Sequence, residues 1–318
     1  MTQHWSDIRE AGALGGMRFM VWIYQRLGLT VFNIVLVPVM IYYFLLRTEA
    51  RRVSLDYLRR MRRYAPDCLP RGPLWFLSYR HFLGFGRSLL EKYQAWKGDM
   101  PTIAMDATEQ AHLFDMVESR RGCLAIGSHL GNLEYSRGIS RRHPGLILNV
   151  LLHDLHNSKF AQLMAQAEPD SRMNLIQVTE FDLPLTLLLK ERVDRGEWVV
   201  MAGDRVPIGG SRRVIQASFL SDPANFPIGP MVMASVLRCP VYLLHCYKKA
   251  GQHQLGFEQF AERISLPVGD KEADLQKYMQ RYATALEKQV VQAPLQWYNF
   301  FDFWEKQADA PEKHPEKP

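Results

Sequence analysis

The sequence predicts an α/β protein, in which helices cover both faces of a sheet. From residue 109 onward, short apolar runs typical of buried strands alternate with longer segments that have helical spacing. The chain has 318 residues, 47% hydrophobic and 23% charged, which is long enough and apolar enough to bury a substantial core. The expected strands are residues 123–126, 146–152, 198–202 and 241–247.

An apolar block near the N-terminus precedes this region. Residues 29–46, "LTVFNIVLVPVMIYYFLL", carry no charge and lie near the lower length limit for spanning a bilayer. Asn33 and Pro38 weaken the case for a straight span. A kinked or monotopic insertion therefore stays open beside a spanning helix, and a buried core helix is the alternative without a membrane. We expect residues 1–50 to form a membrane-anchoring segment.

Seven arginines follow the apolar block, accompanied only by Glu49 and Asp56. A basic cluster after an apolar block is typical of the cytoplasmic side of a membrane anchor, and it also suits an anionic surface. A solvated helix face is the alternative. The sequence shows no zinc-finger spacing and no RNP-like aromatic block, so lipid headgroups are favoured over nucleic acid. The arginines are Arg47, Arg51, Arg52, Arg59, Arg60, Arg62 and Arg63.

The remaining elements are expected to be helices, except at the C-terminus. Residues 51–64 are basic and helical, and residues 72–96 form an apolar helix or helix pair. Further helices are expected at residues 109–122, 158–167, 182–195, 228–238 and 271–292. Residues 297–304 form an aromatic closing segment, which ends a catalytic domain spanning residues 51–305. The tail, residues 306–318, is rich in proline and charge and is expected to be disordered.

Four cysteines show no CxxC pair and no metal-ligand spacing, which indicates reduced thiols in a reducing compartment. Cys246 follows His245, a pairing that could suggest a nucleophile. Both residues lie in the apolar run "CPVYLLHCY", so we interpret Cys246 as a buried structural thiol.

A candidate active site lies in "GCLAIGSHLGNLEYSRG", residues 122–138. His129 directly follows the strand predicted at 123–126, and ligands collect at the carboxyl ends of strands in α/β sheets. Histidine has an ordinary pKa near ~6.5 and can accept a proton at neutral pH if a carboxylate holds its other ring nitrogen. Glu134 is five residues further on. It reaches the imidazole only if His129 lies on a turn before the next helix.

The segment "GSHLGNLE" resembles the H-x4-D/E block of the lysophospholipid acyltransferase superfamily. It is more narrowly similar to the bacterial lipid A biosynthesis acyltransferases, which use acyl carrier protein as the acyl donor. Three later segments resemble that family in the same order: "WVVMAGDRVP", "SFLSDPANFPIGPMVMASVLRCPVYLLHCY" and "PLQWYNFFDFW". Together with the N-terminal apolar block, the resemblance covers most of residues 20–305.

The resemblance implies a glycerolphosphate acyltransferase-like fold with a mixed central sheet. It implies direct acyl transfer without a covalent intermediate, with His129 as general base and Glu134 as the carboxylate that orients it. It also implies acyl carrier protein as donor (acyl-CoA less so), a lipid acceptor, and no cofactor or metal. The implied location is the cytoplasmic face of a bacterial inner membrane. The implied substrate-binding residues are Gly131, Asn132, Asn157, Asp204 and Arg205.

Two departures from the family pattern leave the acceptor open. His153 and Asp154 stand where the family has an Arg-Pro pair, and Arg205 follows Asp204 where a glutamine is usual. The acceptor is therefore either a lipid A precursor or another glycolipid or pigment lipid.

Two other functions compete with acyl transfer. His153, Asp154 and His156 could serve a membrane-associated metal-dependent hydrolase, although their spacing matches no strong zinc pattern. The basic cluster could instead belong to a non-catalytic membrane-binding protein.

Overall fold

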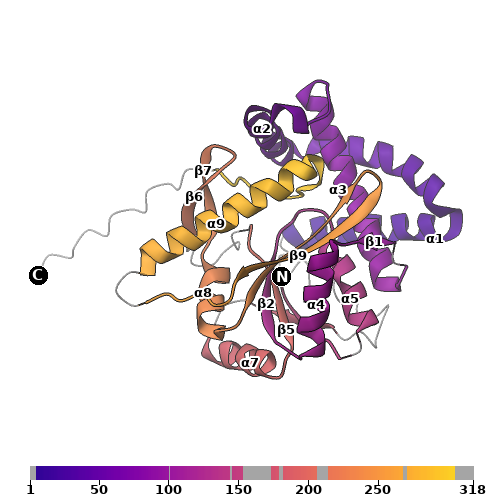
Figure 1. Cartoon of the computed structure of the whole chain (residues 1–318). Coiled ribbons are helices and arrows are strands. Elements are labelled where there is room, and N and C mark those ends of the chain that lie inside the picture. The colour runs from indigo at the N-terminus through magenta and orange to yellow at the C-terminus, as the bar shows by residue number, and fades with distance from the viewer. Residues whose placement is uncertain are drawn as a thin grey trace, which may run out of the picture.

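The computed structural model describes residues 5–99, 101–143, 145–152, 173–178, 182–205, 214–267 and 271–304. These residues form a seven-stranded mixed sheet flanked by helices, together with a separate two-stranded hairpin (Figure 1). The predicted α/β class is confirmed. The strands of the large sheet, in spatial order, are β1 (Ile103–Ala104), β9 (Gln252–Ala261), β8 (Val241–Lys249), β2 (Cys123–Gly127), β5 (Trp198–Ala202), β3 (Leu148–Leu152) and β4 (Met173–Gln177).

The five strands from β8 to β4 run parallel, and β9 reverses direction beside β8. Strand β2 lies between β8 and β5, and all five of its residues are buried, as expected for an apolar run covered on both faces. Its register with β5 pairs Cys123 with Trp198 and Gly127 with Ala202. The carboxyl ends of β2 and β5 therefore lie side by side.

Alternate residues of these strands face two separate cores. Leu124 and Ile126 of β2 join a core shared with α2 (Thr48–Tyr64), α7 (Leu183–Asp194), α8 (Gly229–Leu237) and α9 (Lys271–Gln292). Cys123 and Ala125 join the core under α4 (Ala107–Glu118) and α5 (Arg137–Arg142). The hairpin of β6 (Val214–Phe219) and β7 (Asp222–Pro227) packs on the first core, with Phe219 and Phe226 fully buried.

The four predicted strands are present, with boundaries that differ by at most two residues. The predicted helix at 271–292 matches α9, and residues 72–96 form one helix, α3 (Leu74–Lys97), instead of a pair. The helix expected at 158–167 and the tail at 306–318 lie outside the described residues. Strands β1, β4, β6, β7 and β9 were not expected from the sequence.

Helix α1 (Trp5–Leu46) packs lengthwise against α3, and both gather with α2 at one end of the molecule (Figure 1). Gly28 has φ +80° and ψ 178°, which breaks the helical path and kinks α1. Tyr24 contacts Asp99 and Asn33 contacts Arg87, on the two sides of this kink. Gly15–Leu46 is long and apolar enough to cross a membrane, and only 17% of its most apolar stretch is buried.

The side of α1 turned away from α3 carries large apolar side chains. The exposed members on this helix are Phe19, Trp22, Leu27, Leu29, Ile34, Val37, Ile41, Tyr42, Leu45 and Leu46. Trp75 and Phe76, in the first turn of α3, are also exposed. So many large, exposed apolar side chains on two neighbouring helices are unusual on a protein that contacts only water.

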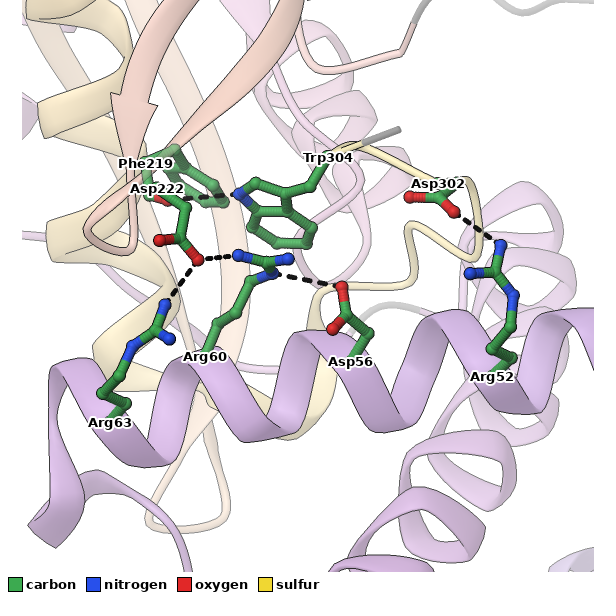
Figure 2. A network of polar contacts seen from close by, with 8 residues as sticks. All are labelled: Arg52, Asp56, Arg60, Arg63, Phe219, Asp222, Asp302 and Trp304. Carbon is green, nitrogen blue, oxygen red and sulfur yellow. Dashed lines mark hydrogen bonds and ion pairs between the residues drawn. The ribbon is translucent and has the colours of Figure 1, made fainter. Parts of the chain in front are cut away.

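Several arginines of the basic cluster bind acidic residues of the same chain (Figure 2). Arg60 and Arg63 both contact Asp222 at the start of β7, and Arg52 contacts Asp302 at 2.5 Å. The Arg60 guanidinium also lies over the ring of Trp304, at 4.6 Å from its centre. These arginines connect α2 to the hairpin and to the C-terminal segment. The cluster as a whole is therefore not available to anionic lipids, although its composition suggested that it was.

Replacing Asp222 with asparagine should lower the free energy of unfolding by about 1 kcal/mol, because Arg60 and Arg63 lose their shared, partly buried carboxylate. Urea denaturation in detergent measures the change. Glu49→Gln is the matched control, since it breaks an ion pair of Arg52 whose two side chains are 57% and 72% exposed. Equal stability of the two variants would contradict the structural role of Asp222.

Candidate active site

His129 lies two residues beyond the end of β2, on a tight turn that leads into a 3₁₀ helix, η2 (Leu133–Ser136). Gly131 has φ +66°, and a Cβ atom there would lie 2.0 Å from the Cys246 carbonyl oxygen. Only glycine fits this position. The predicted turn after the strand is therefore present, and it leaves 28% of the His129 side chain exposed.

The carboxylate that holds His129 belongs to Asp204. The Nδ1 atom of His129 lies 2.7 Å from Asp204 Oδ1, and the backbone N–H of His129 donates to Oδ2 at 2.8 Å. A carboxylate can only accept, so Nδ1 carries the proton and the lone pair of a neutral ring is on Nε2. Nε2 makes no hydrogen bond within the described part of the chain. This arrangement presents a base whose tautomer is fixed.

Strand register explains why these two residues meet. Gly127 pairs with Ala202 in the parallel ladder, and His129 and Asp204 each lie two residues further on. The chains stay in contact beyond the ladder, because Gly203 N–H donates to the Gly127 carbonyl at 2.9 Å. A Cβ at Gly203 would lie 2.7 Å from Ile126 and 2.8 Å from Tyr282, so this close approach also requires glycine.

The aromatic C-terminal segment completes the surroundings of the pair. The Trp297 indole N–H donates to Asp204 Oδ2 at 2.7 Å, and the Asn299 amide donates to the Asp204 carbonyl at 2.8 Å. Tyr298 N–H donates to the His129 carbonyl at 2.9 Å. Three consecutive residues of the segment, which the sequence indicated only as an aromatic closing element, thus contact the two residues of the pair.

Burial and charge set the protonation of the pair. Burial lowers the pKa of His129 below 6.5, and the positive charges of Arg205 and Lys92 act in the same direction, while Asp204 opposes them. Burial alone would raise the pKa of Asp204, but the charge and hydrogen bonds of His129 and the Trp297 bond lower it below 3.8 overall. At neutral pH the pair is therefore a neutral imidazole beside a carboxylate.

Glu134 does not orient His129 in this structure, which corrects the prediction from sequence. Its carboxylate accepts a hydrogen bond from the Trp96 indole at 2.9 Å, and its backbone N–H bonds the Asn132 side chain at 3.1 Å. The 3₁₀ turn at 133–136 directs Glu134 toward α3 and away from Asp204's side of the imidazole. The resemblance implied a substrate-binding role for Asp204, whereas the geometry makes it the hydrogen-bonded partner of the histidine.

The backbone amides near Gly131 are occupied. Gly131 N–H donates to the Gln296 carbonyl and Asn132 N–H to the Cys246 carbonyl, both at 2.8 Å. The resemblance implied that Gly131 and Asn132 bind substrate, but both backbone N–H groups are already used by the fold. The side-chain Nδ2 of Asn132 is buried and has no hydrogen-bond partner among the described residues.

Of the other predicted binding residues, Arg205 lies near the imidazole, since its charge lowers the pKa of His129. Asn157 lies outside the described residues, as do the proposed hydrolase residues His153, Asp154 and His156. In the part of the chain that is described, no three His, Cys, Asp or Glu side chains gather closely enough to hold a metal.

Cys246 is fully buried in β8, and burial raises the pKa of its thiol to about 12. A thiol in this state is a weak nucleophile at neutral pH. The interpretation of Cys246 as a structural residue is confirmed.

A cavity of about 260 Å³ lies on the α4 and α5 side of η2. Its wall is mainly apolar and includes Ile103, Leu113, Phe114, Tyr135, Ile139 and Leu255. Neither His129 nor Asp204 lines it, so the cavity alone does not place an acyl chain against the base.

The sequence profile of the family described as bacterial lipid A biosynthesis acyltransferase matches residues 80–306 of the 318. The match begins within α3 and includes His129, Asp204 and the C-terminal segment. A search of curated proteins gave no match.

Removing either acid tests which one acts on His129. Asp204→Asn should lower the pKa of His129 further, because the charge that favours the imidazolium is lost. Glu134→Gln should leave that pKa unchanged, because this side chain bonds Trp96. Titration of the ring by NMR, with ¹⁵N shifts reporting the Nδ1–H tautomer, measures both variants. A lower pKa in Glu134→Gln alone would restore the partner predicted from sequence.

Proposed function

The chain belongs to the bacterial lipid A biosynthesis acyltransferase family and is an acyltransferase, and on this premise we propose that His129 and Asp204 catalyse the transfer. The proposed donor is a fatty acyl thioester of acyl carrier protein, and the acceptor is a hydroxyl group of a lipid. The observation that carries the proposal is the hydrogen bond of 2.7 Å between His129 Nδ1 and the fully buried Asp204.

In the proposed reaction, His129 Nε2 takes the proton of the acceptor hydroxyl as its oxygen attacks the thioester carbonyl. The thiolate of the carrier leaves as the tetrahedral intermediate collapses, and it takes up the proton. Asp204 holds the imidazole and balances the charge of the imidazolium that forms. General base catalysis of this kind contributes about 10²–10⁴-fold to the rate.

A direct transfer agrees with the residue types at the turn. The segment "GSHLG" carries histidine at the position where a G-x-S-x-G hydrolase carries its serine nucleophile. The described thiols also offer no activated alternative, since Cys123, Cys239 and Cys246 are buried and burial raises the pKa of each. The acceptor oxygen is therefore the proposed nucleophile.

Positive charge near the base supports anionic substrates. Arg205 and Lys92 both act on His129 electrostatically, from the end of β5 and from α3. We assign Arg205 to the oxyanion or to a phosphate of the acceptor, and Lys92 to an acidic carrier or a phosphorylated headgroup. A preorganised donor to the oxyanion contributes roughly 3 kcal/mol to transition-state stabilisation.

The proposed location is the cytoplasmic face of an inner membrane, with residues 1–50 as the anchor and residues 51–305 as the catalytic domain. The packing of α1 supports insertion in the plane of the membrane. Tyr24, Asn33 and Phe44 of α1 contact α3, and two charged residues lie along this contact, Arg87 within α3 and Asp99 just beyond its end. An α1 that crossed the bilayer in this packing would draw those charges into the hydrocarbon, at a cost of several kcal/mol.

His129→Ala should reduce kcat for acyl transfer at least about a hundredfold, because the base is removed while the binding surfaces remain. In the wild-type protein, kcat/KM should rise with pH as His129 deprotonates, with a midpoint below pH 6.5 because the pKa of the folded histidine is lowered. Transfer from acyl carrier protein to extracted lipids, followed by mass spectrometry, measures both. Near-normal transfer by His129→Ala would refute the proposal.

Cysteine labelling tests the in-plane arrangement of α1. Single cysteines replace Gly16, where a Cβ meets nothing within 4 Å, and the exposed Glu49, in a Cys68→Ser background. If α1 lies in the plane, neither cysteine reacts with a membrane-impermeant maleimide in intact cells and both react after lysis. Reaction of only one of the two in spheroplasts would show that α1 spans the membrane.

A further inference from the structure

A chain of buried hydrogen bonds runs from α2 and α3 to the backbone of Trp297. Ser78 donates to Ser54 at 2.8 Å, Ser54 lies 3.0 Å from His81 Nδ1, and His81 Nε2 lies 2.8 Å from the Trp297 carbonyl oxygen. Ser54, Ser78, His81 and Trp297 are each at most 1% exposed. Buried polar groups of this kind are costly unless each is satisfied, so the chain has one fixed arrangement.

The direction of each bond follows from the chemistry. A carbonyl oxygen only accepts, so His81 Nε2 carries a proton. Burial lowers the pKa of His81 to about 4, so the ring is neutral and its Nδ1 accepts from the Ser54 hydroxyl. The ring also stacks on Phe300 at 4.6 Å and on Tyr298 at 5.9 Å between centres. His81 is therefore held in one tautomer and one orientation.

One peptide group connects His81 to His129. The carbonyl of Trp297 accepts from His81, and the N–H of the same peptide unit, on Tyr298, donates to the His129 carbonyl at 2.9 Å. The peptide group is planar and its C=O and N–H point in opposite directions, so neither bond can rotate without the other. The indole of Trp297, attached to this unit, donates to Asp204.

We propose that His81 is a positioning residue of the reaction, which acts through the Trp297–Tyr298 peptide and the Trp297 indole on Asp204 and His129. This inference rests on the proposed function of the pair. His81 lies at the very start of the region matched by the family profile, and Ser54 lies outside it. Arg52 and Arg60 of α2 bind the other end of the same segment, at Asp302 and Trp304 (Figure 2).

The test compares two substitutions at His81. His81→Phe keeps a ring of similar size but removes the donor to Trp297, and it should reduce kcat about tenfold with KM nearly unchanged. His81→Gln places an amide N–H where Nε2 was and should restore most of kcat. If His81→Gln folds but does not recover kcat, the assigned role of the N–H donor to the Trp297 carbonyl is wrong.

Tyr57→Phe is the matched control. Tyr57 is 1% exposed, and its hydroxyl donates to the Pro294 carbonyl at 2.7 Å, so the variant removes an equally buried bond to the same end of the chain. It should lower stability without changing kcat. If His81→Phe and Tyr57→Phe lose activity and stability in parallel, the role of His81 is structural only.

The pH profile gives a readout that a structural role would not move. Loss of the hydrogen bond from the Trp297 indole N–H leaves more negative charge on Asp204. This charge favours the imidazolium, so the acid limb of the kcat/KM profile should move to higher pH. Trp297→Phe should move the acid limb in the same direction. This second variant keeps the proposal testable if His81→Phe does not fold. Asp204, Arg205 and Lys92, the charged groups that act on His129, are unchanged in both variants.

The double variant should show the shift of Trp297→Phe and no more, since His81 is proposed to act on Asp204 through the indole that Trp297→Phe already removes. An unshifted acid limb in Trp297→Phe, or additive shifts in the double variant, would overturn the inference. Full transfer by His129→Ala would instead refute the proposed function. A protein that needs His129 but is indifferent to His81→Phe would retain the proposed function and lose only this inference.

Discussion

The site depends on one buried charge. Asp204 has no exposed surface, and a carboxylate in such a place costs several kcal/mol unless donors surround it. Three N–H groups meet its two oxygens: the backbone and ring of His129 and the indole of Trp297. These donors come from the end of β2 and from a segment that lies 93 residues beyond Asp204 in the chain. The fold must bring both to the end of β5 if the carboxylate is to stay ionised when it is buried.

The geometry of the His129–Asp204 pair is therefore coupled to the packing of the C-terminal aromatic segment. Residues 297–299 supply donors to Asp204 and His129, and the residues after them are held by α2. Gly127 and Gly203 allow the strand ends to approach, and Tyr282 of α9 closes this contact with a bond to the Gly127 carbonyl at 3.0 Å. Loss of any one contact leaves a buried group unpaired, which explains why a small site uses so much of the chain.

Apolar runs and strand-helix alternation were sufficient to predict the fold class, the central strands and the position of His129 just beyond a strand end. The partner of the histidine was missed because local spacing drew attention to Glu134, whereas the true signal is an offset shared by two strands. His129 and Asp204 each follow the first residue of their strand by six positions (129 − 123 and 204 − 198), so parallel pairing places them together. Composition could not show that Arg52, Arg60 and Arg63 face acids of the same chain. Strand β9, "QHQLGFEQFA", was missed because polar residues and a glycine interrupt its apolar residues, so the segment contains no apolar run.

Helix α3 contacts both α1 and the candidate site. His81 bonds the Trp297 carbonyl and the charge of Lys92 acts on His129, and at 3.6 residues per turn these two residues fall within about 20° of one another around the helix. Tyr79, Phe82, Gly86 and Tyr93, which contact α1, lie between about 100° and 160° from His81 on the same projection. Helix α3 therefore presents different faces to α1 and to the candidate site. In the proposed arrangement, with α1 in the plane of the membrane, a lipid acceptor would reach His129 past α3 while its acyl chains stay in the bilayer.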